Sequence, residues 1–471
     1  MSPNYDVVIL GCGEAGIFAA YELTHLHPGL KVLALDQGQD IYHRSCPIVA
    51  GKVKECIHCP VCHTMCGFGG AGAFSDGKLS LSYEVGGDLP TLITPEVAQE
   101  TINYADQIYL DFGADQHIEG LGNDEERKEI RKHAIQAGLK LVDCPIRHMG
   151  TEKAQGIYYA IEKYLQENGV EMYFGYECSN LILENDVCKG VSVSNGKVDM
   201  EIYAKHTVVA TGRRGADWLE KLCAEHNIAH APGTVDIGVR VELPAVIFSH
   251  LTDELYESKI VYRTEKFEDN VRTFCMNPNG IVVNENTNGI VTVNGHSYEG
   301  AEKQTENTNF ALLVAKHFSE PFKDSNGYGE SIARLSNMLG GGVIVQRFGD
   351  LVRGRRSNQK RIEEGLVTPT LSATPGDLSL VLPKRILDGI IEMIYALDKI
   401  APGTANDDTL LYGVEVKFYN MEVELDENLQ SRYPGLYIIG DGSGVTHSLS
   451  HASASGVYVA RHILESEGKA I

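Results

Sequence analysis

The sequence has no Lys/Arg-rich run and no stretch that approaches about eighteen uninterrupted apolar residues. Acidic residues outnumber basic ones, with 64 Asp and Glu against 41 Lys and Arg and a formal net charge of −23. Nucleic acids and anionic membranes are therefore not expected partners. No charged segment with a separate apolar segment precedes the first predicted strand, which begins at Tyr5. We therefore expect a cytoplasmic protein without membrane spans.

The length and the distribution of cysteine limit the class of protein. A chain of 471 residues exceeds one ordinary hydrophobic core, so we expect two domains, one of which can be inserted into the other. A hydrophobic fraction of 43% is enough to fill both cores. The 11 cysteines would suit an oxidising compartment, but five of them lie between Cys46 and Cys66. Such clustering favours metal or redox chemistry over a secreted disulfide framework.

The N-terminal residues have the pattern of a dinucleotide-binding βαβ unit. A buried-strand run at 6–10 is followed by Gly11-Cys-Gly-Glu-Ala-Gly16, an Ala/Leu-rich helical stretch, and a second strand at 31–35 that ends at Asp36. Glycines allow the tight turn and let backbone N–H groups reach a pyrophosphate, and an acidic residue about twenty positions on binds a ribose hydroxyl. The complete order of elements, more than the glycine motif alone, predicts a dinucleotide site.

Two later segments repeat the order of strand, glycine and polar residue. Residues 204–212 form an apolar strand that runs into Ala210-Thr-Gly212, after a predicted helix at 157–168 and several short alternating strands. Residues 435–442 form a strand whose end carries Gly440-Asp441, and a helix-like stretch follows at 452–465. A Gly-Asp pair alone is common turn chemistry. Three such segments far apart in the sequence together predict a discontinuous FAD-binding domain.

With these motifs the chain resembles the flavoproteins of the glutathione-reductase and succinate-dehydrogenase type. Within that superfamily, segments 67–78, 235–240, 412–417 and 440–446 resemble a largely uncharacterised family of FAD-dependent dehydrogenases, over nearly the whole chain. The resemblance implies an α/β fold with a discontinuous Rossmann-type FAD-binding domain, built from a parallel sheet and a β-meander, and an inserted α+β substrate domain. The family has no agreed substrate, so the resemblance leaves the reaction open.

The expected domain boundaries follow from the positions of the cofactor strands. We expect parts of the FAD-binding domain at 1–85, which includes the Cys-rich segment, at 144–234 and at 429–471, and parts of the substrate domain at 86–143 and 235–428. No second G-x-G-x-x-G follows a strand, although disulfide reductases use such a unit for NAD(P)H. The chain is therefore expected to exchange electrons by another route.

The resemblance also implies which residues hold FAD. The first glycine motif and the end of the second strand would bind the ADP half, and Asp441 would face the ribitol and the pyrophosphate. The loop from Gly69 to Lys78 and a helix opening near Ser453 would lie beside the isoalloxazine, where a helix N-terminus stabilises reduced flavin. The expected set is Gly11, Gly13, Glu14, Ala15, Gly16, Asp36, Gln37, Gly70, Ala71, Gly72, Ser75, Ala210, Thr211, Gly212, Gly440, Asp441, Ser453 and Gly456.

The cysteine-rich segment has the C-x2-C-x2-C-x3-C spacing of bacterial ferredoxins, at Cys56, Cys59, Cys62 and Cys66. The first three are the preferred ligands of a [4Fe–4S] cluster. In two-cluster ferredoxins a proline follows the fourth cysteine, whereas here Gly67 follows Cys66 and Cys46 is the cysteine that precedes a proline. Either Cys46 or Cys66 is therefore the expected fourth ligand.

Other interpretations of the same segment remain open. In disulfide-reductase relatives a redox-active cysteine pair lies in this region of the chain, so a Cys62–Cys66 dithiol could exchange electrons with FAD. A zinc ion could bind four thiolates, or thiolates together with His58 or His63. The thiols could also be inert.

Flavin hydride chemistry needs a group that exchanges a proton, and cations if the substrate is a carboxylate. By the resemblance, His447 and His451 lie on the substrate side of the flavin. Lys78, Arg240, Arg272 and the segment 353–356 are candidates to hold an anionic substrate. The competing interpretations are capping or core histidines and a solvated arginine segment.

Two classes of function follow from these residues. The first is a dehydrogenase or ene-type reductase that moves a hydride between FAD N5 and a small organic substrate, with a [4Fe–4S] cluster as electron relay if the cysteines bind one. The second is an electron-transfer flavoprotein that works between a ferredoxin-like donor and a partner protein, or a flavoprotein with a redox-active cysteine pair. The large inserted domain favours the enzyme.

Overall fold

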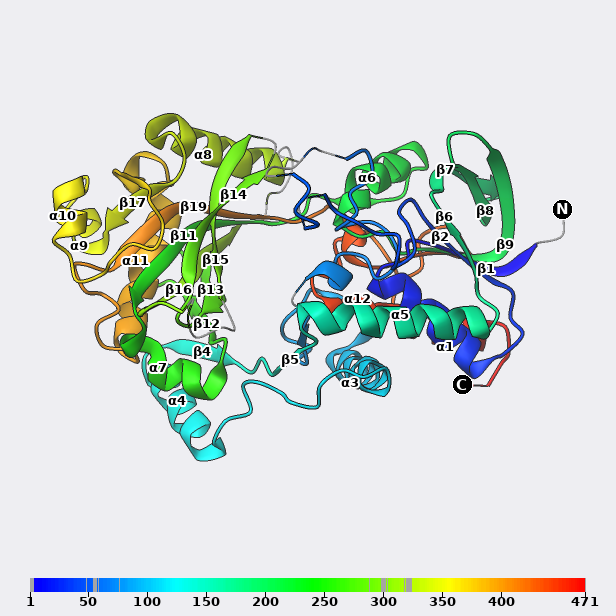
Figure 1. Cartoon of the computed structure of the whole chain (residues 1–471), viewed down its shortest axis with the longest axis horizontal. Helices are drawn as coiled ribbons and strands as arrows, with labels where there is room; N and C mark the ends of the chain where they lie inside the picture. The colour runs from blue at the N-terminus through cyan, green and yellow to red at the C-terminus, as the bar shows by residue number, and fades with distance from the viewer. Residues whose placement is uncertain are drawn as a thin grey trace. The chain divides into compact units, whose positions relative to one another are not determined.

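The computed structural model describes residues 4–470 except 48, 54–56, 58, 76, 288, 298–301, 303, 317 and 319–323. The chain divides into two compact units (Figure 1). Unit 1 comprises the described residues of Met1–Ile118, Ile146–Ala231 and Asn420–Ile471. Unit 2 comprises those of Glu119–Pro145 and Pro232–Tyr419. None of the helices in the described ranges combines the length and the apolar character that a membrane crossing requires.

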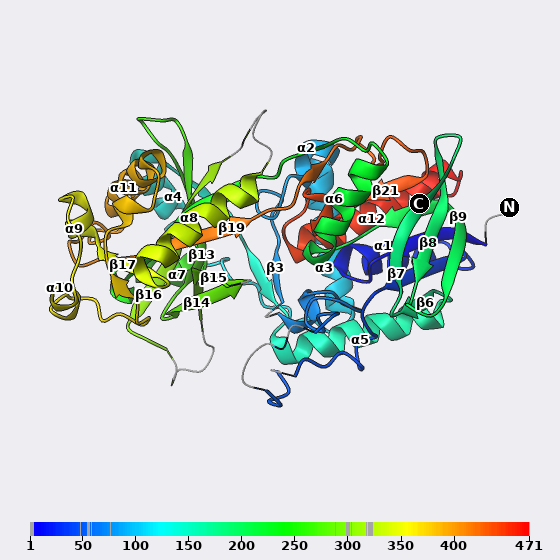
Figure 2. The same cartoon turned by 90° about the horizontal axis from the view of Figure 1, so that it is seen from above.

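Unit 1 is built on a parallel sheet with strand order β6-β2-β1-β9, to which β21 adds by pairing with β9. The β7–β9 meander, visible in Figure 2, extends the sheet beyond β9 in antiparallel fashion. The strands are β1 (Tyr5–Leu10), β2 (Val32–Asp36), β6 (Glu171–Phe174), β7 (Glu177–Glu184), β8 (Val187–Ser194), β9 (Asp199–Val209) and β21 (Leu436–Ile438). This topology confirms the predicted Rossmann-type sheet with a meander.

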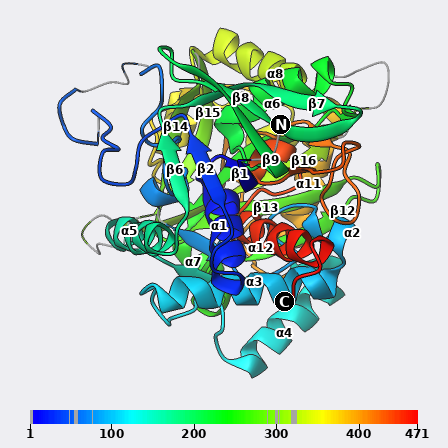
Figure 3. The ribbon, with the colours of Figure 1, turned by 90° about the vertical axis from the view of Figure 1, so that its right-hand side faces the viewer.

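The two faces of this sheet are covered by different elements, because successive side chains of a strand point to opposite faces. In β1, Val7 and Ile9 pack into the core formed with the helices, and Val8 and Leu10 pack into the core beneath the meander. Figure 3 shows α5, α1 and α12 on one side of the sheet. The helices of unit 1 are α1 (Glu14–Leu26), α2 (Leu89–Ile93), α3 (Pro95–Asp111), α5 (Thr151–Glu167), α6 (Ala216–Glu225) and α12 (Leu449–Ser466).

Shorter elements complete unit 1. They are η1 (Gly72–Phe74), the β3 (Lys78–Ser80) and β5 (Ile146–His148) pair, η2 (Arg213–Gly215), the β10 (His230–Ala231) and β20 (Glu422–Val423) pair, and η5 (Asp441–Ser443).

Apart from shifts of two or three residues at 144–145 and 232–234, the division differs from the expected boundaries at two segments. Residues 86–118, expected in the substrate domain, belong to unit 1, because α3 buries Ala98, Ile102 and Ala105 in the same core as α12. Residues 420–428 also belong to unit 1, where β20 pairs with β10. An apolar helical face does not reveal in the sequence which core it joins.

Unit 2 contains a mostly antiparallel sheet with order β18-β17-β19-β11-β16-β13-β12-β4, whose central strands are visible in Figure 1. Its strands are β4 (Leu139–Val142), β11 (Val235–Pro244), β12 (Lys259–Arg263), β13 (Asn270–Asn277), β16 (Asn307–Lys316), β17 (Ile344–Arg347), β18 (Thr374–Pro375) and β19 (Leu410–Phe418), and β14 (Ile281–Thr287) and β15 (Ile290–His296) form a separate hairpin. The helices are α4 (Asp124–Gln136), α7 (Ala245–Leu255), α8 (Ser325–Gly340), α9 (Phe348–Val352), α10 (Gln359–Glu363), α11 (Lys384–Asp398) and the turn η4 (Leu378–Leu380).

The central strand β11 alternates strictly between two environments. Val235, Ile237 and Val239 pack into the apolar core with α7 and α11, whereas Asp236 and Arg240 are buried on the other face. Buried charges require partners. One face of the sheet in unit 2 therefore packs on the main apolar core, and the other face combines buried charges with a smaller apolar cluster that includes Val345, Leu410 and Tyr412.

Candidate functional site

Two positions of the glycine motif leave no room for a side chain. Gly11 has φ +105°, and a Cβ there would lie 2.4 Å from the Ala210 carbonyl oxygen. At Gly16 a Cβ would lie 1.9 Å from the Gly11 carbonyl oxygen. The strand, the turn and the helix can therefore pack this closely only with glycine at both positions.

The N-terminus of α1 presents open backbone donors. Gly13 is the N-cap and supplies no side-chain cap. The N–H of Ile17 donates to the Gly13 carbonyl over 3.0 Å, so the N–H groups of Glu14, Ala15 and Gly16 precede the first helical bond. Such donors, at the positive end of the helix, bind anions.

Asp36 ties the end of β2 to two neighbouring segments. Its Oδ2 accepts from the Cys12 N–H over 2.8 Å, and its Oδ1 accepts from the N–H groups of Gly38 at 2.7 Å and Gly67 at 2.8 Å. A carboxylate has about four acceptor sites. One site therefore remains for a further donor such as a ribose hydroxyl.

Two buried polar atoms in unit 1 test whether these residues fit FAD. Arg44 is 5% exposed and donates to the carbonyls of His63 at 2.9 Å and Phe68 at 2.6 Å, but its Nη2 has no partner within the described residues. The Thr211 hydroxyl is likewise buried without a partner there. Buried polar groups normally have partners. An unpaired guanidinium N–H and an unpaired hydroxyl fit an anionic, oxygen-rich cofactor.

Arg44 was missed by the sequence reasoning. It follows β2 by eight residues, outside every motif considered, and nothing in the pattern separated it from a surface arginine. Only the folded chain reveals its burial over the Phe74 ring, 4.6 Å from the ring centroid.

The three predicted FAD-binding segments meet in unit 1. The Gly442 N–H donates to the Thr211 carbonyl over 2.8 Å, which joins the Ala210–Gly212 turn to the Gly440–Asp441 turn. Asp441 accepts from the Thr446 hydroxyl at 3.0 Å, and Arg213 lies 3.4 Å from its other oxygen. Burial raises the pKa of Asp441, against the opposing effect of Arg213.

The predicted Gly-rich loop packs directly on the start of α1. The Gly69 N–H donates to the Cys12 carbonyl over 2.8 Å, and a Cβ on Gly72 would lie 2.0 Å from Oε1 of Glu14. Two other predicted residues bond within this part of unit 1. The Ser75 hydroxyl donates to the Gly72 carbonyl at 3.0 Å, and Gln37 donates to the Cys66 sulfur at 3.4 Å.

Helix α12 begins earlier than the predicted opening near Ser453. Its first residue is Leu449, and the Ser448 hydroxyl caps it by accepting from the His451 N–H. Ser453 bonds to the Leu449 carbonyl at 2.9 Å and to the Tyr109 hydroxyl at 3.0 Å. A Cβ on Gly456 would lie 2.2 Å from the Ala15 carbonyl oxygen. Ser453 and Gly456 therefore fasten α12 to α3 and α1 instead of forming the open end of a helix.

Four of the predicted metal ligands are described and have free thiols: Cys46, Cys59 and Cys62 are partly buried and Cys66 is buried. Cys56 and His58 lie outside the described residues. Within the ranges described, no group of three or more His, Cys, Asp or Glu side chains is placed to hold a metal ion.

Cys62 and Cys66 lie one turn apart, since the Cys66 N–H donates to the Cys62 carbonyl at 2.9 Å. Burial acts to raise the pKa of Cys62, but hydrogen bonds with Thr64 and Met65 outweigh burial and lower this pKa. Burial and the neighbouring Asp36 carboxylate raise the pKa of Cys66 to about 11. The two thiols therefore have unequal acidity.

Three of the four predicted catalytic side chains lie in unit 1. The segment after β3, the strand of Lys78, packs against the start of α12, where the His447 N–H donates to the Gly86 carbonyl at 2.7 Å. His447 is partly buried. His451 is fully buried, its Nε2 lies 3.3 Å from the Ser82 carbonyl, and burial lowers its pKa to about 4.

Arg240, the fourth, is not free to hold a substrate. It is fully buried in unit 2 and forms two 2.7 Å bonds with the buried carboxylate of Glu415. It also donates to the Cys275 carbonyl at 2.9 Å and to Asn309 at 3.0 Å. Because these internal acceptors bind its guanidinium group in the central strand, Arg240 is a structural ion-pair residue. Arg272 is 40% exposed and pairs with Asp236.

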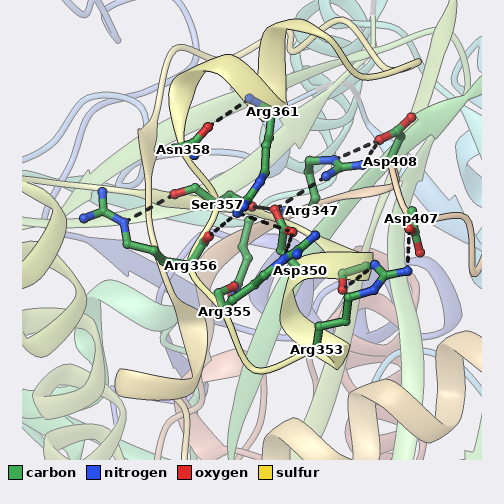
Figure 4. A network of polar contacts seen from close by, with 12 residues as sticks. Arg347, Asp350, Arg353, Arg355, Arg356, Ser357, Asn358, Arg361, Asp407 and Asp408 are labelled. Atoms are coloured by element: carbon green, nitrogen blue, oxygen red, sulfur yellow. Dashed lines mark hydrogen bonds and ion pairs between the residues drawn. The ribbon is translucent and has the colours of Figure 1, made fainter.

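Arg353 and Arg355 of the exposed segment 353–356 form ion pairs within unit 2, and Arg356 donates to the backbone carbonyls of Ser357 and Pro375 (Figure 4). The fully buried Asp350 accepts from Arg355 at 2.7 Å and from the Ser357 hydroxyl at 2.8 Å, and Arg353 pairs with Asp407 at 2.8 Å. These contacts hold the loop around α9. These contacts agree better with a solvated arginine segment than with arginines that hold an anionic substrate.

Two family models match the chain. "FAD binding domain" matches residues 126–238, and "FAD-dependent protein, C-terminal domain-like" matches residues 235–418. An uncharacterised protein of Clostridium beijerinckii is 28% identical over 479 aligned residues, which cover 97% of this chain and 80% of the relative.

The solved structures that match this chain have low sequence identity and low TM-scores. Glycine oxidase of Bacillus cereus is 14% identical with a TM-score of 0.36, over 98% of this chain and 96% of that one. Formate oxidase of Aspergillus oryzae is 10% identical with a TM-score of 0.46, over 98% of both chains. The two matched models together cover residues 126–418, and both describe FAD-binding or FAD-dependent proteins, to which this chain is similar.

Proposed function

We propose that FAD binds noncovalently in unit 1, with its pyrophosphate at the N-terminus of α1, and that the enzyme moves a hydride between flavin N5 and a small organic substrate. One observation carries the proposal: the open N–H groups of residues 14–16 lie in the unit that also buries an Arg44 N–H and a Thr211 hydroxyl, for which the described residues supply no hydrogen-bond partner. Buried polar groups normally have hydrogen-bond partners, and the phosphates and hydroxyl groups of FAD would supply partners for both atoms.

In this proposal each residue has a definite task. The α1 N–H groups and Arg44 bind the phosphates, and Asp36 accepts from a ribose hydroxyl through its remaining lone pair. Asp441 and Thr211 orient the ribityl side of the cofactor through their joined turns. Flavin supplies hydride chemistry when it is bound.

Proton exchange is assigned to His447, which is partly buried at the start of α12. His451 is a positioning residue, because its buried ring fastens α12 to the Ser82 carbonyl and its pKa near 4 keeps it neutral. Lys78, on the strand that leads into this segment, is the proposed contact for an anionic substrate group. Unit 2 is the proposed substrate domain.

For the cysteine segment we propose a [4Fe–4S] cluster held by Cys56, Cys59, Cys62 and either Cys46 or Cys66, which takes electrons from a ferredoxin-like donor. The ferredoxin spacing supports this assignment. Zinc and a Cys62–Cys66 dithiol are the rivals, and the unequal acidity of these two thiols suits the dithiol.

Acid extraction of the purified protein followed by chromatography tests the central proposal. We expect one FAD released per chain. Recovery of FMN, or of NAD without flavin, would contradict it.

A further inference from the structure

Exposed apolar side chains are concentrated in the loop that carries the predicted metal ligands. Fifteen large apolar side chains are exposed in the described part of the chain, and four of them lie within the 24 residues from 42 to 65. These four are Tyr42, Val49, Ile57 and Met65, and the first two are 66% and 67% exposed. Single exposed apolar residues are normal, but a group of them marks a site of interaction.

Helix α5 adds a second aromatic ring to this part of unit 1. The ring of Tyr159 lies edge-on to the ring of Tyr42, with 4.3 Å between the ring centroids, and both side chains are exposed. Two residues after Tyr42, the Arg44 side chain donates to the His63 carbonyl at 2.9 Å. This bond joins the loop near Tyr42 to the turn that carries Met65, so the aromatic pair and Met65 lie on neighbouring parts of unit 1.

Exposed cations accompany these apolar side chains. Arg214, just after the Ala210–Gly212 turn, is exposed and lies close enough to Cys62 and Cys66 for its charge to act on both thiols. Lys52, in the loop itself, is exposed as well. No carboxylate of the described residues forms an ion pair with either cation. Both positive charges are therefore available to a partner.

Two neighbouring carboxylates do not cancel these charges. Asp40, at the start of the loop, pairs with His43 at 2.6 Å, and Asp441 lies 3.4 Å from Arg213. The chain as a whole carries a formal net charge of −23. An acidic partner would be repelled by most of this chain and attracted by the exposed cations near the thiols, and complementary charge of this kind selects where a partner docks.

We infer that this part of unit 1 is the docking surface of a small acidic electron-carrier protein of the ferredoxin type. The surface consists of Tyr42, Val49, Lys52, Met65, Tyr159 and Arg214. The inference rests on the proposed function, in which a ferredoxin-like donor supplies electrons at the cysteine-rich segment. Each encounter would oxidise the carrier by one electron and reduce the centre at the cysteine-rich segment by one.

The composition of the surface suits such a partner. Tyrosine and arginine are the side chains that most often contribute large binding energies at protein interfaces. Redox partners meet through small, transient interfaces, for which a few exposed anchors are enough. An aromatic pair at one part of the surface and an arginine beside the thiols at another would orient the carrier toward the cysteines.

Binding of a purified acidic bacterial [4Fe–4S] ferredoxin to the flavin-loaded protein tests the inference. Biolayer interferometry at about 0.1 M NaCl should show saturable binding whose association slows as salt is added, because salt screens the exposed cations. Arg214→Glu should slow association about tenfold, since charge at an interface mainly affects this rate. Tyr42→Ala should raise the dissociation constant about tenfold through the loss of an aromatic anchor. Both side chains are exposed, so both variants should fold.

Lys197→Glu is the matched control for charge. Lys197 lies in the exposed turn between β8 and β9, outside the docking surface, and its replacement changes the net charge as much as Arg214→Glu does. This variant should bind ferredoxin as the wild type does. An equal loss in Lys197→Glu would indicate a general effect of charge and overturn the inference. Equal binding by the wild type, Arg214→Glu and Tyr42→Ala would also overturn it.

Two further measurements separate the docking surface from the proposed function and from self-association. The flavin content of each variant should equal that of the wild type, so a flavin-loaded protein that binds no ferredoxin would overturn the docking surface and leave the FAD site intact. Reduction by ferredoxin that both surface variants retain in full would keep the proposed donor and remove this surface. Sedimentation velocity of the protein alone should show no dimer that Tyr42→Ala dissociates; such a dimer would assign the surface to a second copy of the chain and overturn the inference.

Discussion

The Gly67 N–H donates to Oδ1 of Asp36 over 2.8 Å and so joins the cysteine-rich segment to the end of β2. The same carboxylate accepts from Cys12 in the glycine turn. A single aspartate therefore connects the predicted ribose site with the segment that carries the predicted metal ligands.

Replacement of Asp36 should weaken FAD binding. In Asp36→Ala the expected loss is about 1–3 kcal/mol of binding free energy, the scale of a charge-assisted hydrogen bond. Fluorescence titration of apoprotein with FAD measures the loss. Asp40→Ala, a change on the adjacent loop outside the FAD set, is the control and should bind FAD as the wild type does. Equal affinities of the Asp36 variant and the wild type would contradict the ribose assignment.

Arg44→Met should reduce FAD affinity about tenfold to a hundredfold, because the buried guanidinium is the proposed phosphate contact and such bonds contribute about 1.5–3 kcal/mol. Arg44→Lys should recover only part of the affinity, since lysine cannot keep the contacts with His63 and Phe68 while it also reaches a phosphate. The unfolding of both apoproteins, followed in urea, separates a folding defect from a binding defect. An unchanged dissociation constant in a folded Arg44→Met protein would remove Arg44 from the site.

NADH and NADPH should be poor direct reductants, because the sequence has no second G-x-G-x-x-G after a strand. Anaerobic stopped-flow absorbance of the flavin after mixing with each nucleotide tests this expectation. Dithionite serves as the positive control for reducibility. Rapid bleaching by micromolar NADH or NADPH would show that another part of the chain binds the nucleotide.

Cys59→Ser should remove iron and leave FAD bound, because Cys59 is not part of the dinucleotide motif. Anaerobically purified wild-type protein should contain about four irons and four acid-labile sulfides per chain. Metal, sulfide and flavin analysis of both proteins provides the measurement. Wild-type protein without iron would contradict the cluster assignment. Bound zinc would then support the zinc site, and a Cys62–Cys66 disulfide would support the redox dithiol.

His451 should make unit 1 less stable in acid. Burial lowers the pKa of His451 to about 4, below the ordinary value of 6.5, so the unfolded state binds the proton first as pH falls. Its contribution is complete above pH 6.5 and decreases by about 2 kcal/mol at pH 5, by linkage. Urea unfolding of His451→Gln and wild type at pH 7 and pH 5 measures the difference. Identical pH dependence of the two proteins would be inconsistent with a buried neutral imidazole.

Much of the dinucleotide unit could be predicted from local sequence. The apolar run at 6–10, the glycines and the second strand each have a local cause, and β1, α1 and β2 lie where these patterns predict them. Gly16 follows from local sterics, because a Cβ there would meet the Gly11 carbonyl oxygen, whereas the Cβ at Gly11 would meet the carbonyl oxygen of the distant Ala210. Neighbours within about forty residues thus determine the strands, the helix and Gly16, but not the close contact at Gly11.

The tertiary structure alone decided which polar side chains have partners. Arg240 appeared in the sequence as a possible substrate anchor, but Glu415, 175 residues away, accepts its donors. Tyr158 meets Glu14 across 144 residues and Tyr109 meets Ser453 across 344. A side chain's burial, charge state and free donors depend on such long-range contacts, and these contacts produce no periodic pattern in the sequence. The sequence by itself therefore determined the cofactor class and the parallel core, whereas folding decided which of its charged and hydroxyl groups remain free for a ligand.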